Sequence, residues 1–212
     1  MTQVYLVRHG QTAWNAELIF RGRRDIELNE RGHREASAIA GALRDKNLDA
    51  IYASPLTRAV ETARPIAALL HREIEPVHCL TDINYGDWEG VPYHEIKTRY
   101  PDLLATWEKE PELVRFPHGE TLDEVRERSY GVLRDLAEKH TDESILIVSH
   151  RVVNKVLLCA VLGLSNAHFW NIKQDTGCIN VIEYTSQGFV LSVLNDTCHL
   201  RGIADGVEQL DF

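Results

Sequence analysis

The feature that most constrains this chain is an apolar strand that ends abruptly in polar side chains. Residues 4–7 read Val-Tyr-Leu-Val, and Arg8, His9 and Gly10 follow them directly. A continuous run of strand-forming residues is typical of a strand buried on both faces by helices. Because ligands of such sheets bind at the carboxyl ends of the strands, we expect Arg8 and His9 to lie at a binding edge.

A second strand repeats this pattern, because residues 144–149 are apolar at their centre and His150 comes next. Between the two, helical periodicity predicts helices over 31–46, 56–71 and 122–140, and short strands over 50–54 and 75–77. A helix over 152–162 and a hairpin of 179–184 with 189–194 complete the chain. This alternation predicts a three-layer α/β/α sandwich with a mostly parallel central sheet.

Residues 80–120 interrupt the alternation, since they contain helical segments at 93–100 and 102–109 and no strand pattern. We interpret them as a small helical cap over the sheet edge. The capping-box pattern at 121–124 starts the next helix. The 212 residues, 44% hydrophobic, predict a single domain over 1–212 with this insertion.

The formal net charge of −9 argues against nucleic acid or anionic membranes as partners, because both attract proteins with surplus Lys and Arg. The first strand begins at once, without a signal region, and no apolar run reaches transmembrane length, so we expect a cytoplasmic protein. The four cysteines form no CxxC pair and the ten histidines no HExxH, which predicts neither metal nor cofactor. No heptad pattern sets an oligomeric state, so a homodimer stays open.

Two histidines at neighbouring strand ends, with Arg8 and with Arg58 near the start of a helix, suit phosphoryl transfer. A neutral imidazole can attack phosphorus while guanidinium groups hold the equatorial oxygens. A carboxyl group must then protonate the leaving oxygen, and Asp82 or Glu89 can supply it. Each of these residues taken alone also fits a surface or core role.

The chain resembles the histidine phosphatase superfamily, also called phosphoglycerate mutase-like, over almost its whole length. The motifs that carry the resemblance are residues 6–12, 14–15, 28–32, 54–59, 61–63, 85–90, 119–121 and 148–150. The resemblance implies that His9 is the phosphorylated nucleophile and that Arg8, Arg58 and His150 bind the transferred group.

The same resemblance implies that Asn15 and the backbone at Gly22 extend the phosphate pocket. Asp82 aligns with the proton donor of the family, which is usually a glutamate and therefore longer by one methylene. Glu89 and Asp87 are the alternative donors.

The implied activity is that of a metal-independent phosphomonoesterase acting on a small phosphorylated metabolite through a phosphohistidine. The short cap favours a phosphatase over a 2,3-bisphosphoglycerate-dependent mutase, which remains an alternative, as does a non-catalytic phosphate-ester-binding protein. The tail at 194–200 looks like that of the metal-independent phosphoserine phosphatases, whereas Tyr85 stands where that branch carries histidine.

Two basic residues depart from the family pattern. Arg21 stands where an uncharged polar residue is frequent, and Arg151 where small residues are frequent. Either can bind a second phosphate or a carboxylate on the leaving group. The alternative is that both point to solvent or pair with surplus acidic residues.

Overall fold

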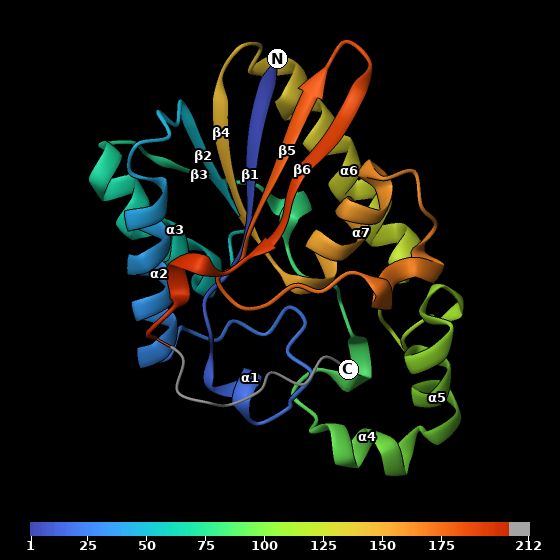
Figure 1. The fold of residues 1–212 in the computed structure, drawn as a ribbon. Helices are drawn as coiled ribbons and strands as arrows, with labels where there is room; N and C mark the ends of the chain where they lie inside the picture. Colours follow the sequence, from blue (N-terminus) through green and yellow to red (C-terminus); the bar gives the residue numbers. More distant parts are fainter. Residues whose placement is uncertain (204–212) are drawn as a thin grey trace.

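In the computed structural model, which describes residues 1–203 except for the side chain of Ala16, a six-stranded sheet lies between two layers of helices (Figure 1). The strands are β1 (Thr2–Arg8), β2 (Ala50–Ala53), β3 (Ile74–Pro76), β4 (Ser144–Ser149), β5 (Ile179–Thr185) and β6 (Gly188–Asp196). Their order is β3-β2-β4-β1-β5-β6, with β3, β2, β4 and β1 parallel and β5 and β6 antiparallel. The predicted sandwich with a mostly parallel sheet is therefore confirmed.

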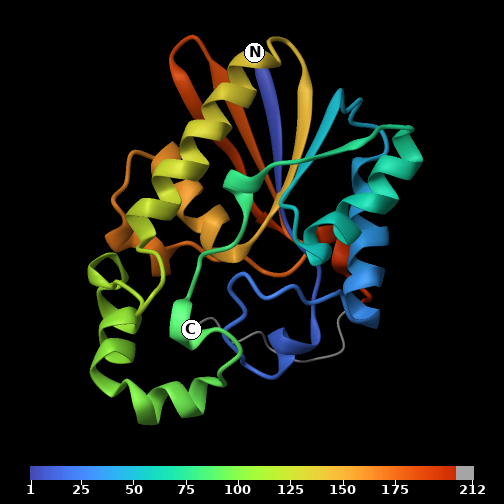
Figure 2. The same cartoon turned by 180° about the vertical axis from the view of Figure 1, so that it is seen from behind.

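The long helices cover the two faces of the sheet, and the short ones lie beyond the carboxyl ends of its parallel strands (Figures 1 and 2). The helices are α1 (Ala13–Ala16), α2 (Glu30–Leu43), α3 (Thr57–Leu70), α4 (Tyr93–Arg99), α5 (Pro101–Lys109), α6 (Leu122–Lys139) and α7 (Arg151–Val161). Short 3-10 turns are η1 (His78–Leu80), η2 (Gly86–Trp88), η3 (Pro111–Leu113), η4 (Asn166–Asn171) and η5 (Cys198–Leu200). Within residues 1–203, no helix combines the length and apolar character that crossing a bilayer requires.

Alternate residues of β1 enter different cores because side chains of a strand point in turn to its two faces. Val4 and Leu6 are buried with residues of α6 and α7, whereas Tyr5 and Val7 are buried with residues of α2 and α3. Both faces are thus apolar. This explains why β1 reads as a continuous hydrophobic run and why polar side chains appear only where it ends.

Several helices and strands begin or end at residues other than those predicted. The helix predicted over 31–46 ends at Leu43, that over 56–71 spans Thr57–Leu70, and the second strand of the hairpin extends to Asp196. Helix α1 was not predicted, because four residues are too few to show a helical period. The capping box is confirmed, since the amide of Glu124 donates to Thr121 Oγ1 at 3.2 Å and the amide of Thr121 to Glu124 Oε2 at 2.8 Å.

The segment 80–120 joins the main core through buried aromatic rings. Phe116 packs against Trp88 and Trp107, with ring centroids 5.0 and 5.2 Å apart. All three side chains are fully or almost fully buried and belong to the same apolar cluster as Val4 and Leu6. The loop that begins this segment is therefore fixed to the sheet.

The loop after β1 lies directly on the start of α2 because two glycines permit the approach. A Cβ on Gly32 would lie 2.1 Å from the carbonyl oxygen of Gln11, and one on Gly10 would lie 2.6 Å from that of Gly32. These neighbours are backbone atoms, which cannot rotate away. The packing fixes the backbone directly after His9.

We expect Gly32→Ala to lower the free energy of unfolding by about 1–3 kcal/mol, because the added methyl group overlaps backbone atoms. Gly41→Ala in the same helix has open space around the new methyl group and should stabilise the protein by about 0.5–1 kcal/mol. Urea unfolding monitored by circular dichroism measures both. Equal stability of the two variants would contradict the packing argument.

Candidate active site

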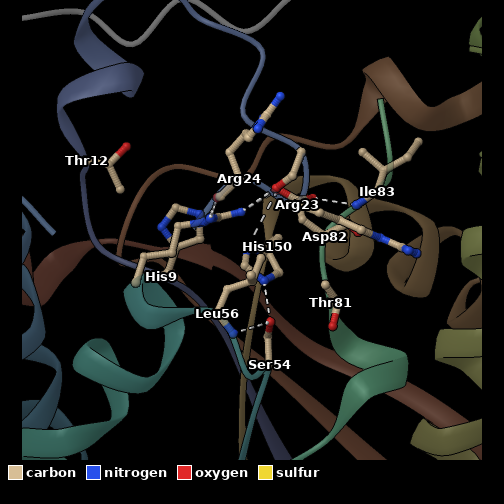
Figure 3. A network of polar contacts seen from close by, with 12 residues as sticks. His9, Thr12, Arg23, Arg24, Ser54, Leu56, Thr81, Asp82, Ile83 and His150 are labelled. Carbon is tan, nitrogen blue, oxygen red and sulfur yellow. Dashed lines mark hydrogen bonds and ion pairs between the residues drawn. The ribbon is translucent and has the colours of Figure 1, made fainter. Parts of the chain in front are cut away.

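Two histidines meet at the carboxyl edge of the sheet because β1 and β4 are parallel neighbours in register. Arg8 pairs with Ser149, so His9 and His150 leave the sheet at the same level. The amide of His9 donates to the carbonyl of Ser149 at 3.0 Å, and the two imidazole centroids are 5.1 Å apart. Figure 3 shows them in one polar network with Asp82 and Ser54. The structure thus brings together residues 141 positions apart.

The hydrogen bonds of His9 determine which ring nitrogen can react. Its Nδ1 lies 2.7 Å from the carbonyl oxygen of Gly10, and because a carbonyl only accepts, Nδ1 must carry the proton. The lone pair is therefore on Nε2, which is buried and has no hydrogen-bond partner among the described residues. Burial, followed by the positive charges of Arg58 and Arg8, holds the pKa of His9 well below its usual value. The imidazole of His9 is therefore neutral at pH 7.

His150 faces His9 from the end of β4. Its Nε2 is 2.7 Å from Ser54 Oγ, and its Nδ1 lies 3.7 Å from Asp82 Oδ2. This Nδ1 is buried and forms no hydrogen bond with the described residues. Burial, and then the charge of Arg58, lowers the pKa of His150 well below its usual value as well. Ser54 is a residue whose orienting role we did not predict, although its motif was part of the resemblance.

Arg58 is fully buried, and backbone oxygens hold most of its guanidinium group. It donates to the carbonyls of Arg24 and Gly22, each at 2.8 Å, and to Asp82 Oδ2 at 3.2 Å. Asp25 caps the helix that carries it by accepting from the amide of Thr57 at 2.7 Å. Since carbonyl groups carry no net charge, Asp82 is the one of these three hydrogen-bond partners that offsets the positive charge of Arg58.

Arg8 is buried at the end of β1 and donates to the carbonyl of Gln174. The side chain of Gln174 donates to Asn180 Oδ1 at 2.7 Å, and Asn180 Nδ2 donates to the carbonyl of Leu6 at 2.9 Å. A polar network that links Gln174 to Asn180 of β5 therefore holds the carbonyl group that Arg8 contacts. No sequence pattern pointed to Gln174, because its partners are distant in the chain.

Among the three candidate proton donors, Asp82 is the one that contacts both Arg58 and His150. Its Oδ1 accepts from the amide of Ile83 at 3.0 Å. Glu89 instead accepts from the amide of Arg23 at 2.8 Å, and Asp87 pairs with His118 at 3.0 Å. The geometry favours Asp82 over both alternatives.

The backbone of Asp82 is held by Arg128 of α6, a residue that the sequence did not single out. Arg128 donates to the carbonyls of Cys79 and Thr81, each at 2.7 Å, and to that of Asp82 at 3.1 Å. Glu120 accepts a hydrogen bond from Arg128 Nε at 3.0 Å, which holds the guanidinium group in this position. On an amphipathic helix, such an arginine is indistinguishable from an ordinary solvent-facing charge.

The remaining predicted residues lie around the edge of this site. Gly22 has φ +52°, and its carbonyl faces Arg58. Asn15 Oδ1 accepts from the amide and hydroxyl of Thr12, each at 2.9 Å, so this oxygen stabilises the start of α1. Arg21 and Arg151 are partly buried, and their positive charges act on each other.

Two buried imidazole nitrogens that form no hydrogen bond with residues 1–203, and that lie among cations, suit a tetrahedral anion. In the described part of the chain, no three His, Cys, Asp or Glu side chains are grouped to hold a metal ion. Neutral His9 Nε2 can act as a nucleophile, the guanidinium groups can bind oxygen atoms, and Asp82 can exchange a proton. The fold and the site together define a phosphoryl-transfer class of protein.

The chain belongs to the histidine phosphatase superfamily, branch 1, whose family model matches residues 4–197. It is 34% identical to phosphoserine phosphatase 1 of Hydrogenobacter thermophilus, over 94% of this chain and 95% of that relative. It is 29% identical to a metal-independent phosphoserine phosphatase of Arabidopsis thaliana, over 96% of this chain and 85% of the relative. The structure of Bacillus stearothermophilus YhfR is similar with a TM-score of 0.91 and 31% identity, covering 94% and 100% of the two chains. The expected family is confirmed.

The lowered pKa of His9 predicts a pH dependence of stability. Unfolded His9 takes up a proton below about pH 6.5, whereas folded His9 does so only at lower pH, so unfolding binds a proton in that range. The free energy of unfolding should therefore fall as the pH is lowered from 7 to 5. His9→Gln should lose less stability over the same range, and urea unfolding at each pH measures the difference. Parallel curves for the two proteins would contradict a lowered pKa.

Proposed function

We propose that this protein is a metal-independent phosphomonoesterase that transfers the phosphoryl group of a small phosphorylated metabolite to His9 Nε2 and then to water. The observation that carries the proposal is the neutral imidazole of His9, whose Nε2 forms no hydrogen bond with residues 1–203. Its ring centroid lies 5.1 Å from that of His150, and the charges of Arg58 and Arg8 act on it. Membership in the histidine phosphatase superfamily supports it.

In the first step, Arg8, Arg58 and His150 hold the phosphoryl oxygens while His9 Nε2 attacks phosphorus. The bond from phosphorus to the leaving oxygen breaks as the nitrogen–phosphorus bond forms. A bound dianion repels the carboxylate of Asp82, which favours its protonated form, so Asp82 can give its proton to the leaving oxygen.

In the second step, Asp82 removes a proton from water, and the resulting oxygen attacks the phosphohistidine. His9 leaves as a neutral imidazole, because Gly10 holds the proton on its Nδ1 throughout. Inorganic phosphate is the product, and Asp82 regains the proton that it gave in the first step. The two steps balance without a metal or redox partner.

Phosphoserine is the first substrate that the comparisons suggest, since two relatives carry that activity in their names. A 2,3-bisphosphoglycerate-dependent mutase would use the same phosphohistidine but return the group to a bound acceptor. Release of free phosphate therefore separates the two activities.

We extend the proposal to one catalytic domain per chain, with segment 80–120 as a cap that supplies Asp82. The proposed location is the cytoplasm, and the net charge of −9 argues against nucleic acid or anionic membranes as partners. The active unit is proposed as a monomer or a homodimer, which sedimentation equilibrium distinguishes.

The test is phosphate release from a panel of phosphomonoesters in the presence of a chelator. We expect chelator-resistant turnover by the wild type and a loss of at least about a thousandfold in His9→Ala, because the covalent step has no other nucleophile. Acid-labile, alkali-stable radioactive phosphate should be trapped on the wild type after rapid quenching. Turnover by His9→Ala at the wild-type rate would overturn the proposed nucleophile.

Asp82→Asn should lower kcat by about 10²- to 10⁴-fold with an alcohol leaving group, because an amide cannot donate the required proton. The loss should be smaller with p-nitrophenyl phosphate, whose leaving group needs little protonation. Asp87→Asn is the matched control, since Asp87 is exposed and pairs with His118. A larger loss in the control than in Asp82→Asn would assign the donor elsewhere.

A further inference from the structure

A buried carboxylate lies directly behind the loop that follows His9. Glu35, in the second turn of α2, is fully buried, and the amide of Gln11 donates to its Oε2 at 2.8 Å. Arg31 Nε and Thr176 Oγ1 donate to its Oε1 at 2.9 and 3.1 Å. Because the amide and the guanidinium group can only donate, the ionised form of Glu35 fits these contacts. The two steps proposed above make no use of this charge.

A single peptide group connects Glu35 with His9. The amide that donates to Glu35 and the carbonyl that lies 2.7 Å from His9 Nδ1 belong to the same peptide, between Gly10 and Gln11. In a trans peptide these two groups point in opposite directions and form one dipole. Its positive end faces the carboxylate, and its negative end faces the imidazole.

The backbone on both sides of this peptide is held by hydrogen bonds. The amide of Gly10 donates to Thr62 Oγ1 at 2.9 Å, and the carbonyl of Gln11 accepts from the amide of Asn29 at 3.0 Å. These contacts keep the peptide in the orientation that joins the carboxylate with the imidazole.

A negative charge at the amide end of a peptide polarises the carbonyl, because hydrogen bonds in a chain strengthen one another. A more negative carbonyl oxygen attracts the Nδ1 proton of His9 more strongly and raises the electron density at Nε2. Carboxylates bonded directly to an imidazole act in this way on metal-binding and catalytic histidines. The charge of Glu35 therefore opposes burial and the charges of Arg58 and Arg8, which lower the pKa of His9.

We infer that Glu35 is a positioning residue that acts through the peptide between Gly10 and Gln11 to make His9 Nε2 a stronger nucleophile. The inference rests on the proposed phosphohistidine mechanism and adds an electrostatic control of its nucleophile. No proton passes through the peptide, because the proton of His9 stays on Nδ1 and Glu35 stays ionised in both steps.

The charge of Glu35 has opposite consequences for the two steps. A more basic imidazole attacks phosphorus faster, but it leaves the phosphohistidine more slowly. Removal of the charge should therefore slow the formation of the phosphohistidine and accelerate its hydrolysis. A displaced or loosened loop would instead slow both steps.

The test measures the two rates separately in Glu35→Gln, which keeps the shape of the side chain and loses its charge. Rapid quenching with radioactive p-nitrophenyl phosphate gives the rate of formation, and decay of the labelled enzyme gives the rate of hydrolysis. We expect formation to slow about three- to tenfold and hydrolysis to accelerate by a similar factor. Assays at about pH 7.5 keep His199 neutral, since its charge also acts on Glu35 and burial lowers its pKa.

Two further variants of α2 complete the test. Arg31→Gln removes the cation that offsets part of the charge of Glu35, so formation should become faster and hydrolysis slower. The side chain of Arg31 is partly exposed, so this variant decides the question if Glu35→Gln does not fold. Glu30→Gln is the matched control, because Glu30 is exposed at the start of the same helix, and it should keep both wild-type rates.

Unchanged rates in the folded Glu35 and Arg31 variants, or changes of both rates in the same direction, would overturn the inference and leave the phosphohistidine mechanism intact. A wild type that forms no acid-labile phosphoenzyme would instead overturn the proposed function on which the inference rests.

Discussion

The parallel pairing of β1 with β4 is the constraint on which the rest of the site depends. Its register places Arg8 opposite Ser149, so the next residue of each strand is a histidine at the same edge. Both strands are buried on both faces, which leaves their ends as the places where polar side chains can emerge. The position of the two histidines thus follows from the pairing and burial of β1 and β4.

A second constraint is that backbone carbonyl groups accept hydrogen bonds from the buried arginines of the site. Arg58 donates to two backbone carbonyls, and Arg8 donates to another. Carbonyl groups satisfy hydrogen bonds of the guanidinium groups without adding a negative charge to the site. Burial, and then the positive charges of Arg58 and Arg8, lower the pKa of His9, so these guanidinium groups favour its neutral form.

The fold and the centre of the site could be predicted because their signals are local. Apolar runs marked the strands, and the residues after them marked His9 and His150. Ser54 and Arg128 act through contacts with residues 96 and 46 to 49 positions away, which no local pattern records. Arg21 and Arg151 are 130 positions apart in the sequence, so only the structure shows that the charge of one acts on the other.

Asp82 illustrates how the backbone can make up for a short side chain. Its carboxylate is one methylene shorter than a glutamate, yet its Oδ2 lies 3.2 Å from Arg58 and 3.7 Å from His150 Nδ1. Arg128 holds the carbonyls before and at this residue, and segment 80–120 is packed into the core by aromatic rings. The reach of an acid in such a site is therefore set by the loop that carries it as much as by its own length. For this reason a longer acid placed on the same backbone need not be a better donor.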